Sequence, residues 1–429
     1  MSLYDWAYLA AAPFVLPVLG YRRLARGKYR ESGPAMLGRG PQWIDPKPYP
    51  NGTIWMHAVS AGEVIAAKAV AAQLKCALPD WPLVASTITE TGQAAARRTL
   101  NEAEEIFYFP LDLSWNVRRF IRRFQPRVAV LFEAELWPNF LLEADSAGAR
   151  AFLLNGRVSE RSFRRYRKVR PLIAGPIQRI RAFCMQTEAD AARMEQIIGR
   201  RDNIFVTGNC KFDAEFPTLT PEERNDWRQR LGIDPQRPLI VAGSTHPGEE
   251  EIVLAAYGAA RKACPDLALI LAPRHPERFE AVAALLKRQG LAFRRAACAE
   301  TAPSPQVVLL DTMGQLAKAY GLGSIAVVGG SFVRIGGHNL LEAAAHSIPV
   351  VYGPHMRRQP DMLRLIGQGG GGLQVQPAAL GKALAELLSN EPRRRDLGRR
   401  ARQTLDENRG SAGKMVEIVR RYALGDVPT

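Results

Sequence analysis

Short apolar runs alternate with longer segments of helical spacing along the chain beyond Pro50. In the first half these runs, rich in Val, Ile and Leu, predict strands at 53–60, 83–89, 127–133, 151–154, 182–186 and 204–207. A second series predicts strands at 239–243, 267–272, 307–310, 325–328 and 350–352. Apolar strands separated by helices are typical of parallel sheets that are covered on both faces. The two series therefore predict two doubly wound α/β domains.

The alternation also predicts where one domain ends and the next begins. Residues 211–224 interrupt it with Pro217 and Pro221, which indicates a linker between domains at 31–210 and 225–429. The last stretch, 378–424, is helical in pattern and rich in Arg, and we expect it to complete the second domain.

The N-terminal segment, residues 1–30, differs from both domains. Residues 3–20 are apolar except for Asp5, and a basic cluster follows them, made of Arg22, Arg23, Arg26, Lys28 and Arg30. A secretory signal carries its positive residues before the apolar stretch, so the order here argues against one. The stretch is near the shortest that spans a bilayer, and its basic flank suits a cytoplasmic leaflet. We expect a membrane anchor that either spans the bilayer or lies in its interface; an ordinary buried helix is the alternative.

Charge and composition narrow the classes of partner. Lys and Arg number 58 against 42 Asp and Glu, a formal net charge of +16, which favours anionic partners. Nucleic acid is not expected, because no nucleic-acid motif appears and aromatic residues do not interleave with the basic run. The 5 cysteines are scattered without a C-x-x-C pair, and the 6 histidines form no H-x-x-x-H pair. We therefore expect neither disulfides nor a required metal.

Two predicted strand ends in the first half carry carboxylates. Glu63 ends the motif HAVSAGE, where a capping box with Ser60 is a sufficient structural explanation and a general base is the functional one. Glu133 and Glu135 follow an apolar strand in FEAELWPN. Burying an unpaired carboxylate is costly, so this pair needs cationic partners or a function. A negative charge at the start of the next helix explains Glu135 better than Glu133.

Three turns in the second half suit a phosphate. They supply the candidate contacts Ser244, Thr245 and His246 of GSTHPGEE, Arg274 of PRHP, and Gly336, Gly337, Asn339 and Glu342 of the glycine-rich loop GGSFVRIGGHNLLE. Turns and helix caps explain any one of these alone, but three in one half favour a nucleotide site. Neither a G-x-G-x-x-G nor a Walker A sequence is present.

A basic stretch at 157–170, RVSERSFRRYRKVR, provides the candidate headgroup contacts Arg157, Arg161, Arg164 and Arg165. A solvated helix face is the common explanation of such a run. The alternative is that these cations bind a phosphorylated lipid headgroup, because they lie in the domain that follows the apolar segment.

Taken together and in this order, the motifs resemble the 3-deoxy-D-manno-octulosonic acid (Kdo) transferases of lipopolysaccharide assembly. The resemblance runs from about residue 30 to about residue 355 through HAVSAGE, FPLDL, FEAELWPN, NGRVSERSFRRY, TGNCKFD, GSTHPGEE, APRHPERF, DTMG, GGSF and GGHNLLE. It implies the GT-B glycosyltransferase architecture, in which two Rossmann-like domains face a central cleft. It also implies an acceptor-binding first domain, a nucleotide-sugar-binding second domain, and an anchor at the cytoplasmic face of the inner membrane.

The same resemblance implies an inverting, metal-independent transfer of Kdo from CMP-Kdo to the 6′-hydroxyl of a lipid A precursor, lipid IVA, with release of CMP. Glu63 would be the general base, and Glu133 and Lys211 would support the transition state. Contacts to CMP would come from Pro273, Arg274, Met313, Gly314, Gln315, Asn339, Leu340, Leu341 and Glu342. The family commonly has Glu where this chain has Gln315, so only backbone contacts to cytosine are expected there.

The expected partners are thus CMP-Kdo, the lipid A precursor and anionic lipids of the inner membrane, and no cofactor is expected. The alternative is another GT-B glycosyltransferase that uses a different nucleotide sugar on a lipid-linked acceptor.

Overall fold

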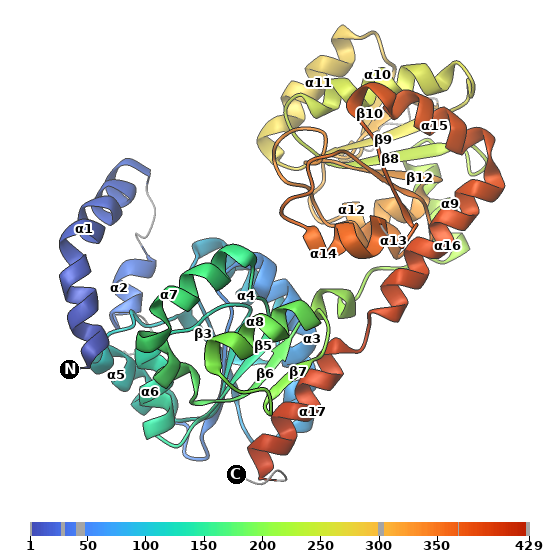
Figure 1. The fold of residues 1–429 in the computed structure, drawn as a ribbon. Helices are drawn as coiled ribbons and strands as arrows, with labels where there is room; N and C mark the ends of the chain where they lie inside the picture. The colour runs from blue at the N-terminus through green and yellow to red at the C-terminus, as the bar shows by residue number, and fades with distance from the viewer. Residues whose placement is uncertain (1, 27–30, 40–47, 299–303, 368, 426–429) are drawn as a thin grey trace. The chain divides into compact units, whose positions relative to one another are not determined.

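The computed structural model describes residues 2–26, 31–39, 48–298, 304–367 and 369–425 (Figure 1). These residues form two compact units, each of which is described by itself. Unit 1 comprises Met1–Ala214 and Asn408–Thr429, and unit 2 comprises Glu215–Glu407.

Unit 1 is built on a sheet of 7 parallel strands in the order β3-β2-β1-β4-β5-β6-β7. The strands are β1 (Thr53–His57), β2 (Leu83–Thr87), β3 (Ala103–Tyr108), β4 (Pro126–Phe132), β5 (Arg150–Gly156), β6 (Ile180–Met185) and β7 (Ile204–Val206). Between and around them lie α1 (Leu3–Arg26), α2 (Ser32–Met36), α3 (Ala61–Ala77), α4 (Glu90–Thr99), α5 (Ser114–Phe124), α6 (Pro138–Ser146), α7 (Glu160–Ile177), α8 (Glu188–Ile198), η2 (Cys210–Asp213) and α17 (Ser411–Leu424).

Both faces of this sheet are buried, as the apolar strands predict. Side chains alternate between the faces, so Trp55 lies in one hydrophobic cluster while Ile54 and Met56 lie in the other. Helices α5, α6 and α8 cover the first cluster, and α3, α4 and α17 cover the second. The sheet is therefore doubly wound.

The C-terminal helix corrects the expected domain boundary at 225–429. Met415, Val416 and Val419 of α17 are buried in the core of unit 1 rather than in unit 2. The Asp213 carboxylate accepts hydrogen bonds from the backbone of Gly410 (2.5 Å) and Ala412 (2.6 Å) at the start of this helix. The last 22 residues of the chain thus belong to the first unit.

Helix α1 is fastened to unit 1 through polar groups near its start. Asp5 is fully buried and accepts hydrogen bonds from the Ser114 backbone (2.8 Å), the Ser114 hydroxyl (2.5 Å) and the Asn139 amide (3.1 Å). Tyr8 donates to Asp112 (3.0 Å), whose carboxylate also accepts from the first amides of α6. Within the described residues, no helix combines the length and the apolarity that crossing a bilayer requires.

Unit 2 contains a second sheet of 7 parallel strands, in the order β10-β11-β9-β8-β12-β13-β14. The strands are β8 (Leu239–Thr245), β9 (Ala268–Pro273), β10 (Phe293–Arg295), β11 (Val307–Leu309), β12 (Ile325–Val328), β13 (Val350–Tyr352) and β14 (Gly372–Gln374). The helical segments are α9 (Pro221–Arg230), α10 (Glu249–Arg261), η3 (Pro276–Arg278), α11 (Phe279–Arg288), α12 (Leu316–Ala319), η4 (Tyr320–Leu322), α13 (Leu341–Ala344), α14 (Pro360–Met362), η5 (Leu363–Gly367), η6 (Pro377–Ala379), α15 (Leu380–Ser389) and α16 (Glu391–Glu407).

Each sheet has one point where the strand order reverses. In unit 1 the chain runs outward from β1 through β2 to β3 and then returns to place β4 on the other side of β1. In unit 2 it runs outward from β8 and returns to place β12 on the other side of β8. Ligands of doubly wound sheets bind at the carboxyl ends of the strands on either side of such a reversal. The two reversals, β1/β4 and β8/β12, therefore mark where sites are expected.

Candidate active site

The reversal in unit 1 brings together the three predicted catalytic residues. Glu63 lies in the first turn of α3, directly after β1, and Glu133 follows the adjacent strand β4. Lys211 lies in η2 and its ammonium group is 3.1 Å from the Glu133 carboxylate. Glu63, Glu133 and Lys211 also act on one another electrostatically, because the charges of Glu133 and Lys211 both shift the pKa of Glu63.

The Glu63 carboxylate is half-buried and is oriented by two hydrogen bonds. It accepts from the Val59 backbone amide and from the Ser60 hydroxyl, each at 2.9 Å. The side chain of Ser60, the N-cap residue of α3, accepts no hydrogen bond from a backbone amide of the helix, so the capping box that offered a purely structural explanation of Glu63 does not form. Burial raises the pKa of Glu63, the Glu133 charge raises it further, and the Val59 amide, the Ser60 hydroxyl and Lys211 oppose the rise. A half-buried carboxylate of raised pKa suits a general base.

Glu133 has an unusual backbone conformation. Its φ of 58° lies in the left-handed region, where a residue with a Cβ is strained. The Glu133 amide donates to the Leu154 carbonyl (3.0 Å), and its own carbonyl accepts from the Arg157 amide (3.3 Å). These bonds to the neighbouring strand β5 and the residue after it hold the strained turn, which directs the carboxylate to Lys211. Such strain is typical of functional sites.

Lys211 is positioned by a network of amide side chains. Asn155, which also has a left-handed backbone (φ 53°), accepts a hydrogen bond from the Cys210 amide (3.1 Å). Gln186 donates to the Asn155 carbonyl (2.9 Å) and accepts from Asn209 (3.1 Å). All three amide residues are buried, and sequence reasoning missed them because nothing in their spacing distinguishes them from turn residues.

Glu135 is a further candidate site residue, which the sequence explained as a negative charge at the start of the next helix. It is half-buried between the ends of the same strands, and its pKa is raised to about 7, first by burial and then by the charges of Glu63 and Glu133. The Tyr166 hydroxyl donates to the Ala134 carbonyl beside it (3.2 Å), which fixes this loop against α7.

The predicted headgroup residues lie on or next to α7. Arg161, Arg164 and Arg165 are exposed, and their spacing places them on one side of the helix. Arg157 precedes the helix and is half-buried. Arg164 forms a 3.3 Å ion pair with Glu160, one turn earlier. The opposite side of α7 packs Phe163, Tyr166 and Ile173 against the core.

In unit 2 the predicted nucleotide residues all follow strands that lie side by side. Arg274 follows β9, the DTMG loop follows β11, and the two glycine pairs follow β12. Met313, Gly314 and Gln315 are exposed at the tip of their loop, with Gly314 in a left-handed conformation (φ 81°). The carboxyl edge formed by β11, β9, β8 and β12 therefore gathers the candidate donor contacts.

Several of these candidates have structural roles of their own. The Thr245 side chain is fully buried and donates to Glu250 (3.2 Å), and the side chains of Leu340 and Leu341 are also fully buried. The side chains at these three positions are therefore not available to a ligand. Ser244 is half-buried with a left-handed backbone (φ 57°).

Asn339 and Glu342 are linked to one another at the start of α13. Asn339 accepts from the Leu341 amide (3.0 Å) and donates to the Glu342 carboxylate (3.3 Å). Burial raises the pKa of Glu342, while Asn339 and the charge of Arg274 oppose the rise. Helix α13 is short, with 4 residues, and Glu342 lies in its first turn.

Glu249 joins the two loops of this reversal, a role that the sequence analysis did not foresee. One carboxylate oxygen accepts from the His246 and Gly330 amides (3.0 and 2.6 Å), and the other accepts from Ser331 and Phe332 (3.0 and 2.8 Å). The side chain is fully buried, and burial raises its pKa against the opposing effect of the four amides. This carboxylate therefore ties the β8–α10 turn to the loop after β12.

Three histidines gather at the same place. The Nε2 atoms of His246 and His338 are 2.7 Å apart, and their ring planes differ by only 3°. The ring of His275 meets that of His246 edge-on, with centroids 5.3 Å apart. Gly336 and Gly337 lie in the same loop as His338 and are buried in left-handed conformations, where an added Cβ would strike Arg358 and Met356.

Over the described residues, no group of three or more His, Cys, Asp or Glu side chains is arranged to hold a metal ion. The cysteines are all free.

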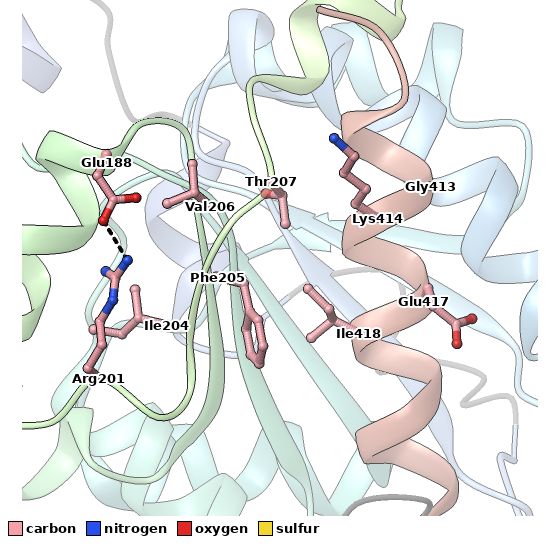
Figure 2. A pocket seen from close by; sticks show the side chains of 10 residues that line it. All are labelled: Glu188, Arg201, Ile204, Phe205, Val206, Thr207, Gly413, Lys414, Glu417 and Ile418. Carbon is pink, nitrogen blue, oxygen red and sulfur yellow. Dashed lines mark hydrogen bonds and ion pairs between the residues drawn. The ribbon is translucent and has the colours of Figure 1, made fainter.

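A cavity of about 730 Å³ lies elsewhere on unit 1, between the edge strand β7 and α17 (Figure 2). It is lined by Phe205, Thr207 and Ile418 among others, and the Glu188–Arg201 ion pair (2.7 Å) lies on one side of it. No residue predicted from the sequence as a site residue lines this cavity. The strand ends, with their strained backbone and perturbed carboxyl groups, define the candidate site better than this cavity.

Solved structures with a similar fold identify the class. UDP-N-acetylglucosamine 2-epimerase from Neisseria meningitidis matches with a TM-score of 0.59 and 12% identity, over 85% of this chain and 99% of that chain. MurG from Acinetobacter baumannii matches with a TM-score of 0.50 and 15% identity, over 86% and 99%. The protein is thus an α/β protein of the GT-B class.

The family follows from the sequence comparisons. The family model described as 3-Deoxy-D-manno-octulosonic-acid transferase (kdotransferase) matches residues 26–214. The 3-deoxy-D-manno-octulosonic acid transferase of Haemophilus influenzae is 33% identical over 98% of this chain and 98% of its own length. The corresponding transferase of Bordetella pertussis is 34% identical over 97% and 98%. The chain belongs to the Kdo transferase family of glycosyltransferases, which confirms the resemblance seen in its motifs.

Proposed function

We propose that the protein transfers Kdo from CMP-Kdo to the 6′-hydroxyl of a lipid A precursor, lipid IVA, with inversion and without a metal, in lipopolysaccharide biosynthesis. The observation that carries this proposal is Glu63, a half-buried carboxylate at the strand reversal of unit 1, aimed by Val59 and Ser60. Membership of the Kdo transferase family supports Kdo as the transferred sugar, and this carboxylate can act as the base that takes the proton of an acceptor hydroxyl.

In the proposed reaction Glu63 takes the proton of the acceptor hydroxyl as its oxygen attacks the anomeric carbon of Kdo. The bond from that carbon to the phosphate of CMP breaks on the opposite face, and CMP leaves with the electron pair. Lys211, neutralised in part by Glu133 at 3.1 Å, offers a positive charge to the developing transition state. General bases of this kind contribute roughly 10²–10⁴-fold to rate.

Unit 2 is the proposed donor-binding unit. Arg274 follows β9, is exposed, and suits the departing phosphate, whose charge must be stabilised as the bond breaks. The exposed loop of Met313, Gly314 and Gln315 is the proposed cytosine contact, through its backbone. Pro273, Asn339 and Glu342 complete the proposed CMP site, with Leu340 and Leu341 contributing backbone groups.

Attachment to the cytoplasmic face of the inner membrane is proposed through α1. The helix exposes large apolar side chains, with Leu3 67%, Trp6 62% and Phe14 80% accessible. The Tyr4 hydroxyl donates to the Leu172 carbonyl of α7 (2.5 Å), so the basic helix lies beside the apolar one. An apolar face beside basic residues binds an anionic lipid interface. The arginines of α7 would then meet the phosphates of the lipid acceptor.

A transfer assay read by mass spectrometry tests the proposal. Full-length protein, CMP-Kdo generated in situ and dispersed tetra-acylated lipid A precursor are combined, with Glu63→Gln and Glu90→Gln tested in parallel. Glu90 is a matched control, because it occupies the first turn of the next helix, α4, and is exposed. We expect Kdo-bearing product from wild type and Glu90→Gln, at least 100-fold less from Glu63→Gln, and a product mass that counts the sugars added.

Two results would overturn parts of the proposal. Undiminished product from Glu63→Gln would show that Glu63 is not the general base, while the assignment as a transferase would stand. No product from folded wild type, together with binding of a uridine diphosphate sugar, would assign the protein to a different donor.

A further inference from the structure

We propose that the His246–His338 pair takes up one proton when the phosphate of the nucleotide binds, so that occupation of the donor site is coupled to protonation. This inference rests on the proposed function, since it names the group that meets the phosphate of CMP and the protonation state in which it does so. It is carried by the contact between the two rings and by the charges that surround it.

The 2.7 Å distance between the two Nε2 atoms requires a proton between them. Two bare ring nitrogens at this distance repel, as do two protonated ones, so one Nε2–H donates and the other Nε2 accepts. The ring that donates from Nε2 then has an unprotonated Nδ1 when the pair is neutral. A single added proton enters there without breaking the bond between the rings and converts that ring to an imidazolium.

The pair is held where a phosphate is expected. His246 directly follows β8 and His338 lies in the loop after β12. Strands β8 and β12, which Figure 1 labels, are the two strands at the reversal of unit 2. Glu249 holds both segments by accepting from the His246, Gly330, Ser331 and Phe332 amides. A Cβ at Gly330 would come within 2.6 Å of the His338 ring, so this glycine allows the ring its place.

The charges facing the pair are almost all positive. Burial is the main cause that lowers the pKa of both histidines, and of His338 to about 4. The charges of His275, Arg274 and Arg358 lower the pKa of both rings further. His246 also lowers the pKa of His338, and Arg278 also lowers that of His246. Arg278 is paired with Glu250 (3.2 Å), and the Glu249 carboxylate is occupied by four amides.

Arg274 and Arg358 are different from Arg278, because both are exposed. Within the described part of the chain, neither of these two guanidinium groups forms a hydrogen bond or ion pair, although Arg274 feels the charge of Glu342. Two uncommitted arginines beside a neutral histidine pair form a site for an anion.

A bound phosphate dianion reverses the electrostatic balance at the pair. Without it, the arginines disfavour an added positive charge; with it, their charge is offset and the imidazolium gains an anionic partner. The proton comes from solvent when the dianion binds and returns to solvent when it leaves. In the proposed reaction the phosphate gains a negative charge as its bond to Kdo breaks, so uptake is greater for CMP than for CMP-Kdo.

Calorimetry of CMP binding to the full-length protein at pH 7.5 tests the inference, in buffers that differ in ionisation enthalpy. A phosphate monoester has its second pKa near 6, so CMP is already a dianion there. We expect wild type to take up a fraction of one proton per CMP, and a larger fraction at pH 7 than at pH 8, a range over which free CMP is mostly the dianion. Affinity should weaken with rising pH, by up to about tenfold per pH unit where a full proton is taken up.

The variants separate this role from a structural one. His338→Gln should bind CMP more weakly and without proton uptake. His346→Gln is the control, because the His346 ring bonds to the Ala317 carbonyl and not to the pair, and this variant should take up protons as wild type does. Cytidine, which lacks the phosphate, should bind without uptake. A nitrogen-15 spectrum of the wild-type imidazoles with and without CMP shows the added proton directly and needs no variant.

The outcomes distinguish the two proposals. CMP binding without proton uptake, or with uptake unchanged in His338→Gln, overturns this inference and leaves the donor assignment intact. No CMP binding to folded wild type overturns the donor assignment and, with it, this inference.

Discussion

Glu249→Gln is the substitution whose effect on unit 2 can be worked out most directly. In the native protein one carboxylate oxygen accepts hydrogen bonds from the His246 and Gly330 amides. The other oxygen accepts from the Ser331 and Phe332 amides. Glutamine is nearly the same size, but one of its two polar atoms is an NH₂ group that only donates. Whichever way the amide turns, two buried backbone N–H groups then face a donor.

The magnitude follows from those two lost bonds. Hydrogen bonds to a charged group contribute about 1.5–3 kcal/mol each, so the substitution should lower the free energy of unfolding by about 3–6 kcal/mol. Whole domains are stable by only about 5–15 kcal/mol. Glu251→Gln is the matched control, because Glu251 is exposed in the same first turn of α10 and contributes chiefly to the helix dipole, about 0.3–1 kcal/mol.

Thermal unfolding and amide hydrogen exchange of the full-length protein measure the effect. Exchange of the Gly330, Ser331 and Phe332 amides should quicken strongly in Glu249→Gln and remain at the wild-type rate in Glu251→Gln. A loss of less than 1 kcal/mol relative to the control, with these amides still protected, would refute the reasoning that one buried carboxylate ties the two loops together.

Four other substitutions test further parts of the structure. The pKa of about 7 at Glu135 lies above its unfolded value of roughly 4.3, so the contribution of Glu135 to stability should fall as the pH rises from about 4 to 7 and then level off. Glu135→Gln should remove this contribution, so the difference in melting temperature between wild type and variant should change over that range, and a difference that does not depend on pH would count against it. Gly330→Ala should destabilise unit 2 by at least about 1–2 kcal/mol, because the φ of Gly330 is 67°. Gly258 lies in an exposed part of α10 with open space around it, so Gly258→Ala should stabilise unit 2 by roughly 0.5–1 kcal/mol in the same melts. Asp5→Ala should free α1, seen as faster exchange of its amides and of the Ser114 amide, and α1 protection at the wild-type level would refute the fastening role.

The strands that the sequence missed all lie at sheet edges, although one edge strand, β7, was predicted at 204–207. Interior strands such as β1 and β8 are buried on both faces and appear as continuous apolar runs. The missed strands β3, β10 and β14 are all edge strands, half-exposed over most of their length. An edge strand needs less apolar surface, so its sequence pattern can be the same as that of a loop.

The sequence by itself determined the α/β class, the two sheets, the family and the residues that follow the strands. Only the tertiary structure decided how those residues are paired. The contacts of Glu63 with Val59, of Lys211 with Glu133 and of Glu249 with the loop after β12 depend on which strands lie side by side. The same holds for His246 and His338, 92 residues apart, and for α17, which returns to the first unit. Periodicity records which face of an element is buried, but the partner across a sheet is set by strand order, which no local pattern contains.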